Sequence, residues 1–168
     1  RVASYDQTVL SAFGQVADKH PDWRQFLLGE GVARAHLTGL IAQHGLEGRA
    51  RRPGFAAVPE RALRAADLFV LSSRFEGFPN VLLEAMAEGL PCISYDCPTG
   101  PRELIEHGVD GWLVPPGDVD ALAVALDTLM QDAAMRQSLG EHAVAVRGKY
   151  GLQAMLERWN ALLASVIA

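Results

Sequence analysis

Short apolar runs alternate with amphipathic segments along this chain of 168 residues, and the alternation repeats several times. Runs of about five apolar residues have the length of buried strands, whereas apolar residues three or four apart indicate helices. The expected strands cover residues 24–28, 49–55, 67–71, 91–95 and 111–114. The expected helices cover residues 8–19, 32–44, 59–66, 79–88, 100–107, 118–130, 133–149 and 151–166. This order predicts an α/β fold with a parallel sheet.

The length of the chain predicts one domain, and its composition excludes several classes of protein. Hydrophobic residues make up 49% and charged residues 21%, which excludes intrinsic disorder. A net charge of −5 argues against a general nucleic-acid-binding protein. Two cysteines, Cys92 and Cys97, cannot form a disulfide framework, and no zinc-ligand spacing surrounds them. Because we find neither a secretory signal nor an apolar run that could span a bilayer, we expect a soluble, cytoplasmic chain.

The loops at the carboxyl ends of the strands are the expected ligand site, because helix N-termini and connecting loops converge at that edge of an open parallel sheet. Four loops qualify, at residues 29–31, 55–58, 72–80 and 96–102. The third loop is the richest in polar and turn-forming residues, so we expect it to carry the chemistry.

This third loop leads directly into a helix. Pro79 suits the first helical position, which needs no N–H donor. The next three N–H groups, of Asn80, Val81 and Leu82, would then be free donors. With the helix dipole behind them they suit an anionic group such as a diphosphate. Glu84 is four residues after Asn80 and would lie beside that anion, where its carboxylate would accept the hydroxyl hydrogens of a ribose.

Glu76 stands before the same helix, and Gly77 after it permits a ligand to approach closely. The Glu76 carboxylate would face a second set of hydroxyls, so the order from Glu84 to Glu76 implies ribose, diphosphate and then sugar. Taken singly, a helical glutamate is usually a solvated surface residue, and Glu-Gly in a loop is usually a turn. The charges and glycines alone therefore leave both interpretations open.

The sequence around these residues closely resembles the signature of the retaining glycosyltransferases of family 4, in the GT-B superfamily. The resemblance lies in residues 66–91 (ADLFVLSSRFEGFPNVLLEAMAEGLP), 100–104 (GPREL), 110–118 (DGWLVPPGD) and 150–159 (YGLQAMLERW). It covers nearly the whole chain in order. The resemblance implies that residues 1–168 are a Rossmann-like three-layer domain, the donor-binding C-terminal half of a GT-B fold, without its first strand and its N-terminal acceptor domain.

The resemblance also implies roles for single residues. Glu76 would contact the donor sugar as the catalytic residue, and Glu84 would hold the ribose hydroxyls. Main-chain amides would bind the diphosphate and approach the sugar, namely those of Gly77, Phe78, Asn80, Val81 and Leu82. Residues in the vicinity of the nucleotide would be Gly29, Gly31, Arg52, Gly54 and Phe55.

The family places two cations, an arginine after the first strand of this domain and a lysine about five or six residues later, against the leaving diphosphate. Arg1 matches the arginine. No lysine follows, because the next residues are VASYDQ, and the two lysines of the chain, Lys19 and Lys149, are misplaced. Either the protein has lost the lysine or a loop between Tyr5 and Thr8 is missing from the sequence, and we favour the second alternative.

The resemblance implies an enzyme that transfers a sugar from a nucleotide-diphosphate sugar, UDP-linked in our expectation, to a saccharide or lipid-linked acceptor with retention. Its process would be bacterial surface-polysaccharide synthesis, and it would need no metal or other cofactor. The isolated domain would be inactive, whereas the full-length enzyme would contact the inner face of the plasma membrane peripherally. Two alternatives remain, a nucleotide-binding module that has lost transfer activity and a GT-B nucleotide-sugar epimerase.

Three further expectations concern residues outside the main loop. Thr99 would cap the helix that begins at about residue 100. The basic cluster at residues 49–52 would be either a solvated edge or an aid to the diphosphate. Trp159 would be a packing anchor in the last helix, which in the family packs back toward the partner domain.

Overall fold

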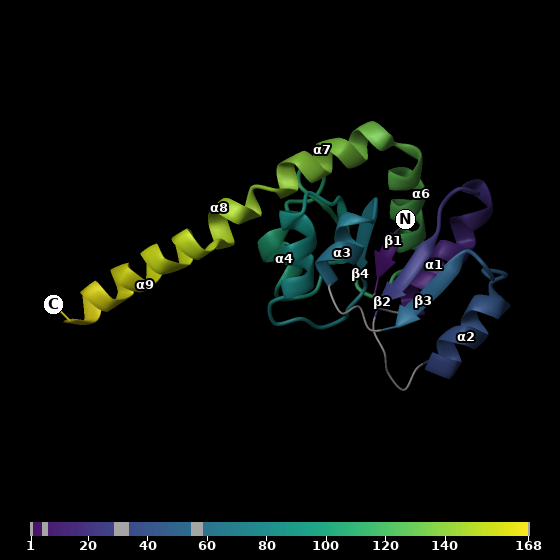
Figure 1. The fold of residues 1–168 in the computed structure, drawn as a ribbon, viewed down its shortest axis with the longest axis horizontal. Helices are drawn as coiled ribbons and strands as arrows, with labels where there is room; N and C mark the ends of the chain where they lie inside the picture. The colour runs from purple at the N-terminus through teal and green to yellow at the C-terminus, as the bar shows by residue number, and fades with distance from the viewer. Residues whose placement is uncertain (1, 5–6, 29–33, 55–58, 168) are drawn as a thin grey trace.

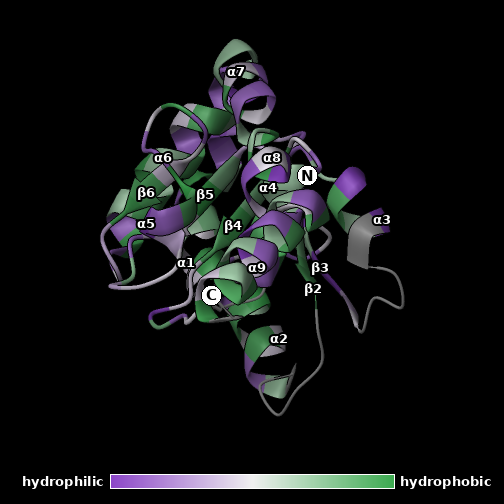
Figure 2. Ribbon diagram, turned by 90° about the vertical axis from the view of Figure 1, so that its left-hand side faces the viewer, coloured by the Kyte–Doolittle hydropathy of each residue, from purple (hydrophilic) through white to green (hydrophobic). Residues whose placement is uncertain are grey.

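The computed structural model describes residues 2–4, 7–28, 34–54 and 59–167. Within these ranges, strands form one sheet in the order β3-β2-β1-β4-β5-β6, and every neighbouring pair is parallel. Figure 1 labels β1 to β4, and Figure 2 labels β5 and β6. The strands are β1 (Val2–Ser4), β2 (Gln25–Leu28), β3 (Ala50–Gly54), β4 (Leu68–Leu71), β5 (Cys92–Tyr95) and β6 (Trp112–Val114). The expected parallel α/β fold is confirmed.

Helices cover both faces of the sheet, as in a Rossmann-like three-layer domain. They are α1 (Gln7–Val16), the short 3₁₀ helix η1 (Ala17–Lys19), α2 (Arg34–Gln43), α3 (Pro59–Arg64), α4 (Asn80–Ala87), α5 (Pro101–Leu104), α6 (Val119–Gln131), α7 (Ala133–Ala143), α8 (Val146–Tyr150) and α9 (Leu152–Ile167). One hydrophobic core joins the sheet to α1, α2 and α6, and a second joins it to α3, α4, α5 and α8.

Strand β4 shows how the sheet separates the two cores. Leu68 and Val70 belong to the first core, whereas Phe69 and Leu71 belong to the second. Successive side chains of a strand point to opposite faces, and both faces of this sheet are covered, so all four residues are buried. This is why the segment reads as a continuous apolar run, which Figure 2 shows as the hydrophobic colour of β4.

The first strand of the sheet differs from the expectation. β1 lies at the centre, where Val2 pairs with Gln25 of β2 and with Leu68 of β4. This three-residue strand follows Arg1 in the sequence, whereas the strand that we expected to be missing would precede Arg1. Arg1 itself lies outside the described residues. A three-residue strand is too short to show a hydrophobic period, which is why the sequence did not predict it.

The helix expected at residues 100–107 is shorter than predicted. α5 ends at Leu104, and Ile105 has the extended conformation (φ −105°, ψ 125°). The N–H of Glu106 donates to Oδ1 of Asp110 (2.7 Å), and Gly108 has φ +80°. A local turn therefore replaces the last helical turn, because a side-chain acceptor and a glycine make it favourable.

The helix expected at residues 133–149 is divided into α7 and α8. Between them the N–H groups of Ala145 and Arg147 donate to carbonyls three residues earlier, at His142 and Val144, instead of four. The tighter turn changes the direction of the chain. As a result, Val146 of α8 is buried in the second core.

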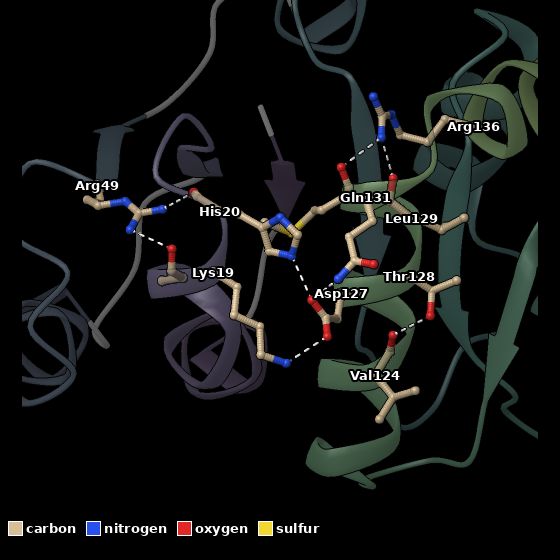
Figure 3. A network of polar contacts seen from close by, with 11 residues as sticks. Lys19, His20, Arg49, Val124, Asp127, Thr128, Leu129, Gln131 and Arg136 are labelled. Carbon is tan, nitrogen blue, oxygen red and sulfur yellow. Dashed lines mark hydrogen bonds and ion pairs between the residues drawn. The ribbon is translucent and has the colours of Figure 1, made fainter.

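A polar network joins the segment after α1 to α6 (Figure 3). Asp127 accepts hydrogen bonds from Nζ of Lys19 (2.8 Å) and Nε2 of His20 (2.7 Å), and these bonds hold the pKa of its carboxyl below the usual range. Arg49 donates to the carbonyls of Ala17 (2.7 Å) and His20 (2.5 Å). Neither interpretation of the basic cluster holds for Arg49, because its guanidinium stabilises this corner of the fold.

Helix α9 projects away from the sheet and its covering helices (Figure 1). Its apolar residues recur every three or four positions, and they are exposed: Leu152, Met155, Leu156, Trp159, Leu162, Leu163 and Val166. We call this set the α9 stripe. Trp159 is 56% exposed, so it does not pack within the described part of the chain, and its packing against a partner domain stays a prediction. Amphipathic periodicity shows that a helix has an apolar face, but not that its own domain covers that face.

Candidate functional site

The site lies where the connections of the sheet change direction. β1 and β4 are adjacent, yet β1 continues through α1 to β2 on one side and β4 continues through α4 to β5 on the other. The carboxyl ends of two such strands border a crevice that binds ligands in open α/β sheets. Residues 5–6 after β1 lie outside the described residues. The described wall of the crevice is therefore the loop after β4, residues 72–79.

The helix at this loop begins one residue later than expected. α4 starts at Asn80, and Pro79 precedes it with φ −81° and ψ 84°. The carbonyl of Pro79 accepts from Leu82 (3.0 Å) and Leu83 (3.1 Å), while the N–H of Asn80 donates to Phe78 (3.0 Å). Two of the three amides that we expected to be free are thus already bonded, which corrects that expectation.

The amide of Val81 is the remaining member of the three, and it has no acceptor within the described part of the chain. The same holds for the amides of Gly77 and Phe78 in the preceding turn. These three N–H groups stand at the start of α4, where the helix dipole favours an anion. Leu82 contributes to the core instead, because its side chain is fully buried.

Glu76 and Glu84 stand on opposite sides of these amides along the chain. Glu76 is half-buried in the loop, and Glu84 is exposed on α4, one turn after Asn80. Glu84 also lines an open cleft of about 270 Å³ between α4 and α8. Glu76 is thus partly accessible to solvent, and Glu84 is exposed.

The loop after β5 holds the loop after β4 in place. The hydroxyl of Thr99 donates to the carbonyl of Glu76 (2.5 Å), and the thiol of Cys97 donates to the carbonyl of Ser73 (2.8 Å). The expectation that Thr99 caps the next helix is wrong, because Gly100 occupies the cap position and Thr99 is turned toward Glu76.

Gly100 brings the two loops into direct contact. Its φ is +90°, and a Cβ atom at this position would lie 2.7 Å from Cδ of Pro79 and 3.2 Å from the carbonyl oxygen of Gly77. Both the backbone conformation and the space therefore require glycine. The turn at residues 76–79 is held by contacts with this glycine as well as by hydrogen bonds.

Some of the charged side chains around the turn at residues 76–79 have a partner of opposite charge, and others do not. Burial raises the pKa of the Cys97 thiol, and the nearby carboxylates of Glu76 and Asp96 raise it further, so the thiol is neutral. Arg102 forms two hydrogen bonds of 2.8 Å with Asp96 at the rim of the site. Arg74 is exposed, and among the described residues no acceptor binds its guanidinium. The expected lysine is not found here either, since Lys19 pairs with Asp127 and Lys149 lies beside Tyr150.

The residues expected to bind the donor fall into three groups. The structure brings one group together in a single loop and helix: Glu76, Gly77, Phe78, Asn80, Val81, Leu82 and Glu84. Arg52 and Gly54 lie on β3, the edge strand, which is separated from β4 by two strands. With about 4.8 Å between strands, that separation is roughly 14 Å. Arg1, Gly29, Gly31 and Phe55 lie outside the described residues.

Arg52 and Gly54 differ in their relation to the site edge. Arg52 donates to Oγ1 of Thr38 (2.7 Å) in α2, which accounts for part of its hydrogen bonding within the fold. Gly54 is the last residue of β3 and therefore stands at the same edge of the sheet as the turn at residues 76–79.

The described residues contain no group of three or more His, Cys, Asp or Glu side chains that could hold a metal ion. Among the helices of these residues, none combines the length and the apolar character needed to cross a bilayer.

The family described as Glycosyl transferases group 1 matches residues 6–145. The chain is 37% identical to an exopolysaccharide phosphotransferase of Streptomyces coelicolor, over 95% of this chain and 17% of that protein. It is 34% identical to the lipopolysaccharide core biosynthesis glycosyltransferase LpsE of Rhizobium meliloti, over 83% of this chain and 41% of that protein. The chain thus spans less than half the length of these curated relatives.

Solved structures of similar fold include HepE of Anabaena in complex with UDP-glucose, with a TM-score of 0.87 and 26% identity over 98% of this chain and 48% of that one. The C-terminal domain of the group 1 protein LpcC of Francisella tularensis has a TM-score of 0.79 and 26% identity, over 89% of this chain and 85% of that one. The structural neighbours are GT-B glycosyltransferases.

Proposed function

The chain belongs to the family of group 1 glycosyl transferases, and from this premise we propose that it is the donor-binding half of a retaining glycosyltransferase. The observation that carries the proposal is the arrangement at the start of α4. Along the chain, the accessible residues Glu76 and Glu84 stand before and after amides that have no acceptor in the described part of the chain. The amides can donate hydrogen bonds to a diphosphate, and the two carboxylates can accept hydrogen bonds from sugar hydroxyls. A nucleotide sugar contains both kinds of group.

In this proposal the amides of Gly77, Phe78 and Val81 receive the diphosphate and approach the sugar. The carboxylate of Glu84 accepts hydrogen bonds from the ribose hydroxyls, and Glu76 faces the donor sugar. The relative HepE was solved with UDP-glucose, which supports uridine diphosphate as the carrier. Gly54 lies at the same edge of the sheet, on a strand roughly 14 Å from β4, and this distance suits the nucleobase.

The proposed reaction is a front-face displacement. The bond between the anomeric carbon and the diphosphate oxygen breaks, and a bond from the same face to the acceptor oxygen forms. The proton of the acceptor hydroxyl passes to the departing diphosphate, so no separate base is needed. Glu76 orients the sugar and supports the positive charge that develops on it, because a fixed carboxylate stabilises such charge in a site shielded from water.

The acceptor would be a saccharide or a lipid-linked saccharide of surface-polysaccharide synthesis, bound by a second domain. Two observations support this part of the proposal. The relatives are more than twice as long as this chain, and the α9 stripe is uncovered within it. A second domain that packs against α9 would bury those apolar residues. The full-length enzyme would act at the cytoplasmic face of the membrane.

A second candidate is a nucleotide-binding module without transfer activity. The observation that favours it concerns the cations, because neither lysine of the chain stands at the turn at residues 76–79. Loss of one charge that stabilises a leaving diphosphate commonly lowers a rate by about 10²- to 10³-fold.

Calorimetric titration of the 168-residue chain with UDP and with UDP-glucose tests the proposal, and adenosine serves as a control without a diphosphate. We expect binding of both uridine nucleotides. Absence of any heat with millimolar UDP and UDP-glucose would contradict the donor-binding function. Binding without transfer by the full-length protein would favour the second candidate.

A further inference from the structure

Helix α8 is attached to both helices that follow the site loops. Arg147 donates through Nε to the carbonyl of Ala87, at the C-terminal end of α4 (2.6 Å). At the other end of α8, the hydroxyl of Tyr150 donates to the carbonyl of Glu103 in α5 (3.2 Å). Val146, the first residue of α8, is buried in the second core. The position of α8 is therefore fixed relative to α4 and α5.

Tyr150 also touches the turn at residues 76–79. The centroid of its ring lies 5.5 Å from that of Phe78, with an angle of 57° between the ring planes. Tilted aromatic pairs at this distance are favourable. The ammonium of Lys149 lies 5.0 Å from the centroid of the Tyr150 ring and donates to the same Glu103 carbonyl (3.3 Å). The ring is thus held by a cation, a hydrogen bond and an aromatic neighbour.

Glu103 extends these contacts to the other loop. Its Oε1 accepts a hydrogen bond from the N–H of Gly100 (3.4 Å), and Gly100 lies against Pro79. Tyr150 is therefore connected to the turn in two ways. Its ring contacts Phe78 directly, and its hydroxyl is linked through Glu103 and Gly100 to Pro79. Tyr150 belongs to a segment about 70 residues away from the turn in sequence.

We propose that Tyr150 is a positioning residue that fixes the backbone of the turn at residues 76–79. Phe78 is 41% exposed, and among the described aromatic residues Tyr150 is the one that contacts its ring. Gly77 beside it has no side chain that would limit backbone rotation. Without the Tyr150 ring, Phe78 would turn toward solvent and the amides around it would lose their common orientation. The role of this turn toward a donor sugar rests on the proposed function.

The same residue connects the turn to α9. Gly151 joins α8 to α9, and a Cβ atom there would lie 2.3 Å from the carbonyl oxygen of Arg147, so the connection is tight. Arg158 of α9 donates back to the carbonyl of Lys149 (3.0 Å). A partner bound to the α9 stripe would therefore act on a segment that contacts the site.

Amide hydrogen exchange measured by NMR on the 168-residue chain tests the proposal without any ligand. The reporters are the amides of Asn80, Leu82 and Leu83, which donate to carbonyls of the turn. Tyr150→Leu should raise their exchange rates at least about fivefold, because the turn opens more often. Tyr150→Phe retains the ring and should change them less than about twofold. Tyr150→Met is the second variant if the leucine variant does not fold.

The amides of β5 are the internal reference, because this strand lies inside the sheet between β4 and β6, its residues are buried, and its exchange reports global opening. Unchanged exchange at the three reporters in both Tyr150→Leu and Tyr150→Met would overturn the proposal, as would an equal increase in β5. Calorimetry with UDP-glucose then adds the functional readout, and we expect weaker binding in Tyr150→Leu than in Tyr150→Phe. If the wild-type chain does not bind UDP-glucose, the proposed function fails, whereas the exchange result still decides the role of Tyr150.

Discussion

The hydroxyl of Thr99 donates a hydrogen bond of 2.5 Å to the backbone carbonyl of Glu76, across 23 residues of sequence. The bond fixes the main chain of the residue that we assign to the donor sugar and does not involve its carboxylate. A side chain of the loop after β5 thus determines where the loop after β4 presents its acid.

Thr99→Val removes the hydroxyl and retains the shape of the side chain. We expect an unfolding free energy lower by about 1 kcal/mol and an affinity for UDP-glucose weaker by about fivefold, because a lost hydrogen bond of this kind has that magnitude. Urea denaturation and calorimetry measure the two effects. Thr99→Ser keeps the donor and should resemble the wild type, so equal losses in both variants would argue against the hydrogen bond.

Gly100→Ala should destabilise the chain more than Gly117→Ala does. Both glycines have positive φ, +90° and +79°, but a Cβ at Gly100 would meet Pro79 whereas one at Gly117 would meet open space. In each variant an alanine in the left-handed backbone region lowers the unfolding free energy by about 1 kcal/mol. In Gly100→Ala the steric contact with Pro79 lowers it further. Equal midpoints of thermal unfolding in the two variants would show that the loops after β4 and β5 can move apart without loss of stability.

Glu84→Ala should weaken the binding of UDP at least tenfold, because the ribose hydroxyls lose their acceptor. Glu141→Ala is the matched control, an exposed glutamate of α7 whose carboxylate pairs with Gln137. Calorimetry on the isolated chain suffices, since transfer is not required. Equal affinities of the two variants would remove Glu84 from the site.

Glu76→Ala should leave UDP affinity within about twofold of the wild type. In the full-length enzyme the same change should lower the rate of sugar transfer by about 10²- to 10³-fold, because support for the developing charge is lost. Steady-state transfer and UDP titration together separate the two effects. A full-length Glu76→Ala enzyme of normal activity would exclude this residue from the mechanism.

Asp127→Asn should lower stability at neutral pH and have little effect in acid. Hydrogen bonds from Lys19 and His20 hold the folded pKa of Asp127 below its unfolded value. A lowered folded pKa adds stability above the unfolded pKa, near 4, and this stability is lost as the pH falls through the folded value. The difference in unfolding free energy between wild type and variant should be smaller at pH 2.5 than at pH 6, as measured by urea denaturation. Asp22→Asn, an exposed position, should show no such difference.

Much of the fold could be predicted because its signals are local. β4 reads as a buried strand within five residues, and α4 is marked by its apolar spacing and by Gly89 after it, which has φ +77°. The order of strand, loop and helix then located Glu76 and Glu84 in one unit. The parallel sheet followed from the alternation of these elements, since such connections place consecutive strands side by side.

The rest of the site depends on contacts that leave no local pattern. Thr99 is 23 residues from Glu76, and Tyr150 is 72 residues from Phe78, so neither partner could be inferred from spacing. Proline is typical of the first helical position, yet the ψ of 84° at Pro79 places this residue before the helix. β1 was missed because three residues carry too little periodicity.

Helix α9 leaves the domain at Gly151 and carries the uncovered stripe. A gene shortened to end after Gly151 would lose those seven apolar side chains and the hydrogen bond from Arg158, yet retain Tyr150 and both loops of the site. Under the proposed function, such a fragment would be a starting point for a fluorescent sensor of nucleotide sugars, because labels on its loops would report the ligand without the aggregation that an exposed apolar helix promotes.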